Sequence, residues 1–180
     1  MKDIILIALE QEAPHMAEWD NVFFTGVGKV NAAIMTARLI ERYTPHTIYN
    51  FGTAGGVRVS SGINEIQNFV QRDMMCCELG SAPGQTPFEE NIELSFGDGL
   101  LCSTGDNFVT DPSTLVYMPD VVDMEAYAIA KACIFAGVEF KCYKYVSDQA
   151  DENASKDWQD TVADGEKHYI EIYQQITGGF

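Results

Sequence analysis

Short apolar runs alternate with stretches of helical periodicity along this sequence. Unbroken runs of β-branched and other apolar residues predict buried strands. Such runs occupy residues 4–9, 21–26, 47–51, 100–104 and 139–147, while residues 62–73 predict a strand by alternation. The run at 47–51 leads into small residues, Gly52 to Gly56, which predict a turn with room for a ligand beside the backbone. Strands joined by helices through short links indicate an α/β protein with a mainly parallel sheet.

Three segments have the spacing of three and four residues that predicts an amphipathic helix. In residues 25–43, a glycine turn precedes an apolar stripe made of Val30, Ala33, Ile34, Ala37 and Ile40. Residues 121–133 join the end of a strand to a stripe made of Ala126, Ile129, Ala130 and Cys133. Residues 156–176 predict one terminal helix that carries Trp158, Val162, Ile170, Tyr173 and Ile176.

Residues 74–91 interrupt this pattern with an irregular excursion rich in glycine and proline. The segment is unusually apolar for a loop, with Met74, Met75, Cys76, Cys77 and Phe88. It could cover a site, contact a partner subunit or pack underneath the domain, and the sequence does not separate these. No repeat, linker or low-complexity tract divides the chain, so one domain over residues 1–180 is expected.

The charge balance narrows the classes of partner. The chain has 11 basic and 27 acidic residues, for a formal net charge of -16. Nucleic-acid backbones and anionic membrane surfaces both require basic patches, so neither is an expected partner. No apolar run approaches a membrane span. The five cysteines are odd in number and form no CxxC pair, which indicates reduced thiols in a cytoplasmic protein.

Acidic residues follow several predicted strands where ligands bind in α/β proteins. Glu12 comes after the first strand, Asp123 and Glu125 stand at a strand-to-helix junction, and Asp148 ends the last strand. Asp123 and Glu125 alone fit helix capping as well as a site. Several carboxylates at one sheet edge would repel unless they had distinct tasks, as in acid–base cleavage of a glycosidic bond.

Two other kinds of site are disfavoured. The glycine turn that precedes the first helix lacks the Walker A and GxGxxG patterns, so phosphate binding there is weakly supported. The three histidines, His15, His46 and His168, are scattered and none stands near a second metal-type ligand, so no metal or cofactor is expected.

Six motifs occur in a familiar order: ALEQE, TGVGKVNAA, NFGTAGG, TGDNFV, VVDMEAYAIA and VSDQAD. Together they resemble the purine nucleoside phosphorylase and nucleosidase superfamily over most of the chain. The branch that they resemble most is that of the 5'-methylthioadenosine/S-adenosylhomocysteine nucleosidases. The resemblance implies a three-layer α/β/α sandwich with a central mixed, twisted sheet, a homodimer, and hydrolysis of the N-glycosidic bond of a purine nucleoside.

The resemblance also implies roles for the acidic residues. Glu12 would position and activate the attacking water, and Asp148, with Ser147 beside it, would protonate N7 of the departing purine. Glu125 would grip the ribose hydroxyls while Met124 packs against the sugar. An aspartate at position 148 suits adenine, whose amino group can donate to the carboxyl.

Other roles come from the same resemblance. Phe108 would stack on the base, and the backbone of Val109 would hydrogen-bond to its edge. Thr53 would lie near the nucleophile, and Trp158 falls in the region of the aromatic lid. Asp123 stands where the nucleosidases commonly have glutamate, so a structural role is expected for it.

Water is favoured over phosphate as the nucleophile. Asn50 stands where phosphorylases of this superfamily place an arginine, and the acid at Glu12 would repel phosphate. A phosphorylase and a non-catalytic nucleoside-binding protein are the alternatives. The chain is shorter than typical members of the family, and residues 12–25 and 56–104 are abbreviated. The sequence therefore leaves the 5' substituent of the substrate open.

Overall fold

The chain folds around one mixed sheet, as described by a computed structural model that covers residues 3–178. The strands are β1 (Asp3–Ile7), β2 (Val22–Phe24), β3 (Thr47–Gly56), β4 (Ile63–Gln71), β5 (Leu94–Ser95), β6 (Leu100–Thr104), β7 (Val121–Asp123) and β8 (Glu139–Asp148). The helices are α1 (Lys29–Tyr43), α2 (Ala126–Ala136), α3 (Ala154–Thr161) and α4 (Glu166–Thr177). The strand order is β2-β1-β3-β7-β6-β4-β5, with β8 paired to both β3 and β4.

The sheet combines parallel and antiparallel pairs. Strand β2 runs parallel to β1, and both β1 and β8 run parallel to β3. The chain therefore leaves all of these strands at the same edge of the sheet. In contrast, β7 is antiparallel to the end of β3, and β8 is antiparallel to β4. The predicted mixed sheet is therefore confirmed.

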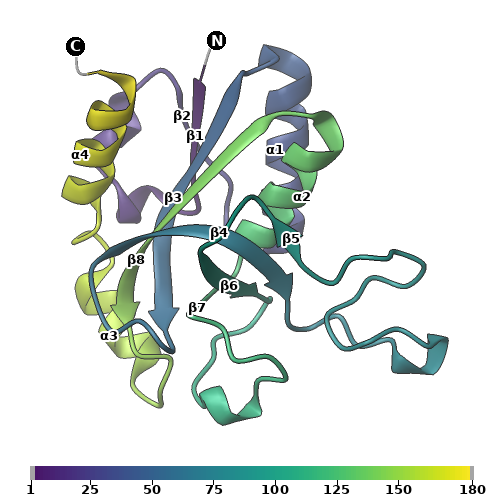
Figure 1. Ribbon diagram of the computed structural model, residues 1–180. Helices are drawn as coiled ribbons and strands as arrows, with labels where there is room; N and C mark the ends of the chain where they lie inside the picture. The colour runs from purple at the N-terminus through teal and green to yellow at the C-terminus, as the bar shows by residue number, and fades with distance from the viewer. Residues whose placement is uncertain (1–2, 179–180) are drawn as a thin grey trace.

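Helices cover the two faces of the sheet, which confirms the predicted three layers. On β1, Ile4 and Leu6 join a buried cluster that includes residues of α1 and α2. Their neighbours Ile5 and Ile7 point to the opposite face and join a cluster with residues of α4. This alternation is the period of two that a strand imposes on its side chains. Figure 1 shows α1 and α2 together on one side of β3 and β8, and α3 and α4 on the other.

The predicted apolar face of α1 is only partly correct. Val30 and Ile34 are 67% and 55% exposed, whereas the residues of α1 that face the core are Ala32, Thr36 and Leu39. The rest of the predicted stripe lines an open apolar groove between α1 and α2, which Phe135 also lines. Within the stripe, Ala33 and Ile40 pack partly against the core, whereas Val30, Ile34 and Ala37 are exposed in the part of the chain that the structure describes.

Two further predictions are wrong in part. Residues 52–56 form no turn but continue β3, because they pair with β8 and then with β7. Residues 156–176 form two helices instead of one, because α3 ends at Thr161 and α4 begins only at Glu166. At the break, Gly165 lies so close to Tyr145 that a Cβ atom there would be 2.9 Å from the tyrosine Cβ.

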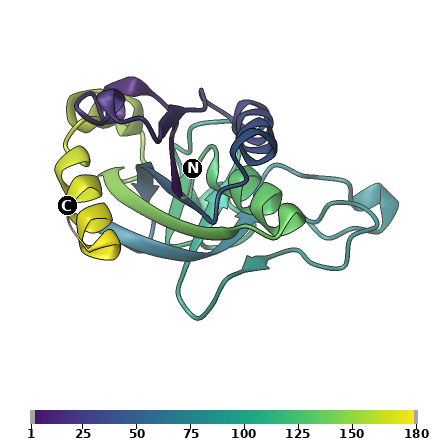
Figure 2. The same cartoon turned by 90° about the horizontal axis from the view of Figure 1, so that it is seen from above.

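The excursion at residues 74–91 is irregular, as predicted, apart from a short 3₁₀ turn at Cys77–Leu79. It projects away from the sheet in both views (Figures 1 and 2). Met75, Leu79 and Phe88 are exposed, so the segment does not pack underneath the sheet. None of the described helices combines the length and apolar character that a bilayer crossing requires.

Candidate active site

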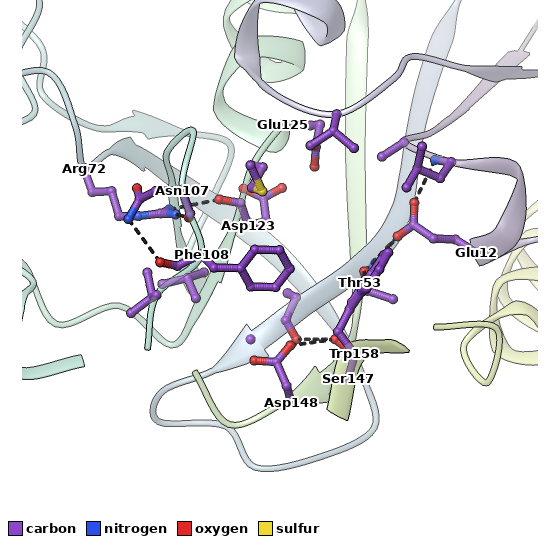
Figure 3. Close-up of a pocket in the computed structure, with 18 residues that line it drawn as sticks. Glu12, Thr53, Arg72, Asn107, Phe108, Asp123, Glu125, Ser147, Asp148 and Trp158 are labelled. Atoms are coloured by element: carbon purple, nitrogen blue, oxygen red, sulfur yellow. Dashed lines mark hydrogen bonds between the residues drawn. The ribbon is translucent and has the colours of Figure 1, made fainter. Parts of the chain in front are cut away.

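A cavity opens where β1, β3, β7 and β8 end, and it collects side chains from all of them (Figure 3). All nine residues that the sequence predicts for a site line this cavity: Glu12, Thr53, Phe108, Val109, Met124, Glu125, Ser147, Asp148 and Trp158. These residues are spread over most of the chain. The fold therefore brings together the motifs that the sequence presents separately.

Glu12 lies on the short 3₁₀ turn that follows β1, and its side chain is buried. Its Oε1 accepts hydrogen bonds from the backbone N–H and the hydroxyl of Thr53, at 2.9 and 2.8 Å. Its Oε2 accepts from the backbone N–H of Leu9 at 2.9 Å. A carboxylate with three donors on it is held in one orientation.

The two acids around Met124 have different surroundings. Asp123 is buried and accepts from the Ala126 N–H at 2.8 Å, which caps the start of α2. It also forms a buried ion pair with Lys144, with 2.9 Å between Oδ2 and Nζ. Burial alone would raise the pKa of Asp123, but the Lys144 ammonium together with hydrogen bonds from Thr104 and the Ala126 N–H outweighs it and holds that pKa below its ordinary value. Asp123 is therefore a structural anion.

Glu125 faces the cavity and the start of α1. Its Oε1 accepts from the Gly28 N–H at 2.8 Å, where the glycine turn enters the helix. Burial, together with the charge of Asp123, raises the pKa of Glu125 to about 7. The α1 N-terminus thus fixes one carboxylate oxygen of Glu125 and leaves the other able to bind a ligand.

Asp148 ends β8 and is buried beside Gly55 of β3. A Cβ atom at Gly55 would lie 2.8 Å from Asp148 Oδ1, so only glycine leaves room for the carboxyl. Burial raises the pKa of Asp148, although hydrogen bonds from the Ala150 N–H and the Ser147 hydroxyl oppose it. This setting favours a carboxyl group that carries a proton.

Aromatic and apolar groups form the remaining walls. Phe108, which is 46% exposed, and Trp158 of α3 meet edge to face, with 6.3 Å between ring centroids. Behind Phe108, Val109 packs with Val122 and Ala150 in a small buried cluster. Such a pair of aromatic faces suits a planar apolar ligand.

Sequence reasoning missed two charged residues of the site. Arg72 lines the cavity, and its guanidinium donates to the backbone carbonyls of Ser103, Gly105, Asn107 and Asp123 at 2.5 to 3.1 Å. It thereby holds the loop that carries Phe108. Lys144 is 1% exposed and lies behind the cavity. The sequence offers no signal that separates Lys144 from Lys141, which lies three residues earlier in the same strand.

The cavity therefore brings three buried carboxyl groups together, those of Glu12, Glu125 and Asp148, in three different hydrogen-bonding environments. These carboxyl groups are suited to acid–base chemistry on an uncharged ligand. Among residues 3–178, no group of three or more histidine, cysteine, aspartate or glutamate side chains is arranged to hold a metal ion.

Comparisons with known proteins show the family of the chain. The sequence model described as "Phosphorylase superfamily" matches residues 21–66. The 5'-methylthioadenosine/S-adenosylhomocysteine nucleosidase of Geobacillus thermodenitrificans is 31% identical over 175 residues, which cover 82% of this chain and 74% of that protein.

Solved structures show the same fold. S-adenosylhomocysteine nucleosidase of Streptococcus pyogenes, in complex with 5-methylthiotubericidin, has a TM-score of 0.83 at 23% identity, covering 96% of this chain and 94% of that one. Futalosine hydrolase of Helicobacter pylori has a TM-score of 0.81 at 18% identity and covers 93% of both chains.

Proposed function

Because the chain belongs to the 5'-methylthioadenosine/S-adenosylhomocysteine nucleosidases and is an N-ribosyl hydrolase, we propose that the cavity described above cleaves adenine nucleosides by the following mechanism. The observation that carries it is the convergence of Glu12, Glu125 and Asp148 on one cavity with aromatic walls. Cleavage of the C1'–N9 bond leaves positive charge on the ribose and negative charge on the base. The three carboxyl groups meet these charges in different ways.

Asp148 is the acid in this proposal. Its proton passes to N7 of adenine, which neutralises the leaving group as the bond to C1' breaks. The raised pKa of Asp148 supports this role, because an acid must still hold its proton near neutral pH. Ser147 donates to Asp148 Oδ2 at 2.9 Å and so stabilises the carboxylate that proton transfer leaves behind.

Glu12 is the base. It accepts one proton of the attacking water while the water oxygen bonds to C1', so the products are adenine and a free ribose derivative. The three hydrogen bonds from Thr53 and Leu9 support this role, since they fix the direction in which the carboxylate can receive that proton.

Glu125 binds the ribose. Gly28 occupies one oxygen of its carboxylate, and the other accepts hydrogen bonds from the sugar hydroxyls. Met124 packs against the sugar, Phe108 stacks on the base, and the backbone of Val109 binds the edge of the base. The negative charges near the sugar also favour the oxocarbenium-like transition state.

The phosphorylase alternative lacks a cation for phosphate. Among the described residues that line the cavity, Arg72 is the only cationic one, and its two terminal nitrogens already donate to four carbonyls. Asn50, where a phosphorylase has arginine, donates to the backbone carbonyls of Leu6 and Phe51. Lys144 is paired with Asp123.

Incubation with methylthioadenosine, with and without phosphate, tests the proposal. We expect adenine and a free ribose derivative at equal rates under both conditions. A ribose 1-phosphate product, or a requirement for phosphate, would contradict it. S-adenosylhomocysteine and adenosine in the same assay report the 5' substituent, for which methylthio and homocysteinylthio groups are the proposed candidates.

We also propose that residues 1–180 act as one domain of a cytoplasmic homodimer. The exposed part of the α1 stripe and the groove beside it support the dimer, because Val30 and Ile34 are apolar side chains that the described residues leave exposed. Phe135, at the rim of this groove, is 95% exposed. Large exposed apolar patches mark contact surfaces, and a second copy of the chain would cover this one.

A further inference from the structure

Trp158 contributes to the site in two ways. Its ring packs against Phe108, and its indole N–H is linked through Thr53 to Glu12, the proposed general base. From α3, its Nε1 donates to the Thr53 hydroxyl at 2.9 Å. The same hydroxyl donates to Glu12 Oε1 at 2.8 Å. A chain of two hydrogen bonds therefore links α3 to the turn that follows β1 (Figure 3).

The chemistry of the donors fixes which group donates and which accepts in these two hydrogen bonds. An indole N–H can only donate, and a hydroxyl has a single proton. Because the Thr53 oxygen accepts from Trp158, its proton is free to point at Glu12. The backbone N–H of Thr53 donates to the same carboxylate oxygen at 2.9 Å, so one residue directs two donors at Oε1.

We infer that Trp158 is a positioning residue for hydrolysis, which holds the Thr53 hydroxyl and, through it, the Glu12 carboxylate in the orientation that receives the proton of the attacking water. The inference rests on the proposed role of Glu12 as base. It gives Trp158 a task that a phenylalanine in the same place could not perform.

Helix α3 also connects these two hydrogen bonds to Asp148, the proposed general acid. It begins six residues after Asp148, and the Thr161 hydroxyl lies within hydrogen-bond distance of two carbonyl acceptors, Ser147 at 2.9 Å and Asp157 of its own helix at 2.8 Å. The helix is thus tied to the strand end that carries the acid and, through Trp158, to the base. A shift of α3 would disturb both groups together.

A double-mutant cycle separates this role from simple packing. Trp158→Phe keeps an aromatic ring near Phe108 but removes the donor, and Thr53→Val removes the hydroxyl at similar volume. We expect Trp158→Phe to lower kcat for adenine release from methylthioadenosine by about three- to tenfold, the effect of one net hydrogen bond, with KM within about twofold. In the Thr53→Val background, Trp158→Phe should have no further effect on kcat.

Trp19→Phe is the matched control, because Trp19 packs on Tyr173 of α4, away from the cavity. It should leave kcat unchanged. It also makes Trp158 the only tryptophan of the chain, since there are two in total. In that background, Thr53→Val should shift the tryptophan emission while Thr53→Ser should not, which tests the hydrogen bond without altering Trp158.

Independent, multiplicative effects of Trp158→Phe and Thr53→Val on kcat would overturn the inference, as would equal emission spectra for the serine and valine variants. An unchanged kcat in Trp158→Phe would do the same. Glu12→Gln separates this failure from failure of the proposed function. If Glu12→Gln retains full turnover, the assignment of the base is wrong, whereas an inactive Glu12→Gln with independent effects in the cycle removes only the role of Trp158.

Discussion

Lys144 and Asp123 form an ion pair of 2.9 Å in which both side chains are 1% exposed. The pair joins β8 to the end of β7 directly behind the cavity. A Cβ atom at Gly52 would lie 3.3 Å from Lys144 Nζ and 3.5 Å from Glu12 Oε1, so the ammonium also lies close to the proposed base. The site thus rests on a buried cation that offsets part of its negative charge.

Replacing Lys144 should destabilise the protein strongly. In Lys144→Met, Asp123 would remain as a buried charge without its partner, and such a loss costs about 3–5 kcal/mol in the free energy of unfolding. Urea unfolding measures it. Lys141→Met is the matched control on the same strand, because Lys141 is 34% exposed and pairs loosely with Glu139, so its loss should cost less than about 1 kcal/mol. Equal costs for the two variants would contradict the prediction.

Asp148→Asn should abolish turnover and leave ligand binding largely intact. An amide has the shape of the carboxyl but cannot transfer the proton to N7, and loss of a general acid lowers kcat by about 10²- to 10⁴-fold. Adenine release gives kcat, and titration with adenine gives the affinity. Asp160→Asn, at an exposed position of α3, is the control and should keep full activity. Turnover at the wild-type rate would remove Asp148 as the acid.

The pH dependence of activity should follow from the same residue. Because burial raises the pKa of Asp148, the proton needed at N7 is present below that pKa and is lost as the pH rises through it. We expect kcat to fall on the alkaline side of its optimum. A kcat that stays constant into the alkaline range would show that no such acid is required.

Nucleoside affinity should weaken as the pH falls below about 7. The pKa of Glu125 is raised to about 7, so its carboxylate is ionised above that value and accepts from the ribose hydroxyls, whereas below it the group is protonated. Isothermal titration with a non-hydrolysable nucleoside analogue, from pH 5.5 to 8.5, measures the effect. Adenine lacks the ribose and is the control ligand. Glu125→Gln should bind the analogue weakly with little change over this range, and a pH-independent wild-type affinity would contradict the assignment.

Charge placed in the α1/α2 groove should separate the proposed dimer. Wild-type protein should have about twice the chain mass of 19.9 kDa by light scattering, whereas Val30→Glu combined with Phe135→Glu should have the mass of one chain. Ile176→Glu introduces one such charge on α4, at the other face of the sheet, and should leave the mass unchanged, and each single variant of the groove can be compared with it. A wild-type protein with the mass of one chain would refute the dimer.

The site residues that could be predicted from the sequence are those whose position depends on their immediate sequence neighbours. Glu12, Glu125 and Asp148 each follow a strand within a few residues, so a strand prediction also places them at the sheet edge. Arg72 and Lys144 gave no comparable signal, because their partners lie on other strands and only strand order brings them together.

The fold followed the same division. The strands at residues 100–104 and 139–147 were predictable from their composition, and β6 and β8 match them closely. The exposed side of α1 could not be predicted, because periodicity identifies an apolar stripe but does not identify the neighbour that covers it. The break before α4 contains Gly165, where a Cβ atom would lie 2.9 Å from that of Tyr145 on β8, a long-range contact that no local pattern reveals.

The grip of Arg72 on the Phe108 loop has a consequence for how this pocket could diversify. Its guanidinium binds backbone carbonyls, so the loop conformation does not depend on which side chains the loop carries. Two positions of the loop are constrained, because a Cβ atom at Gly105 would lie 2.8 Å from the arginine side chain and the Asp106 carboxylate accepts from the Lys29 N–H at 2.8 Å. Under the proposed role of Phe108, exchange of that side chain would alter base preference while Arg72 keeps the loop backbone in place.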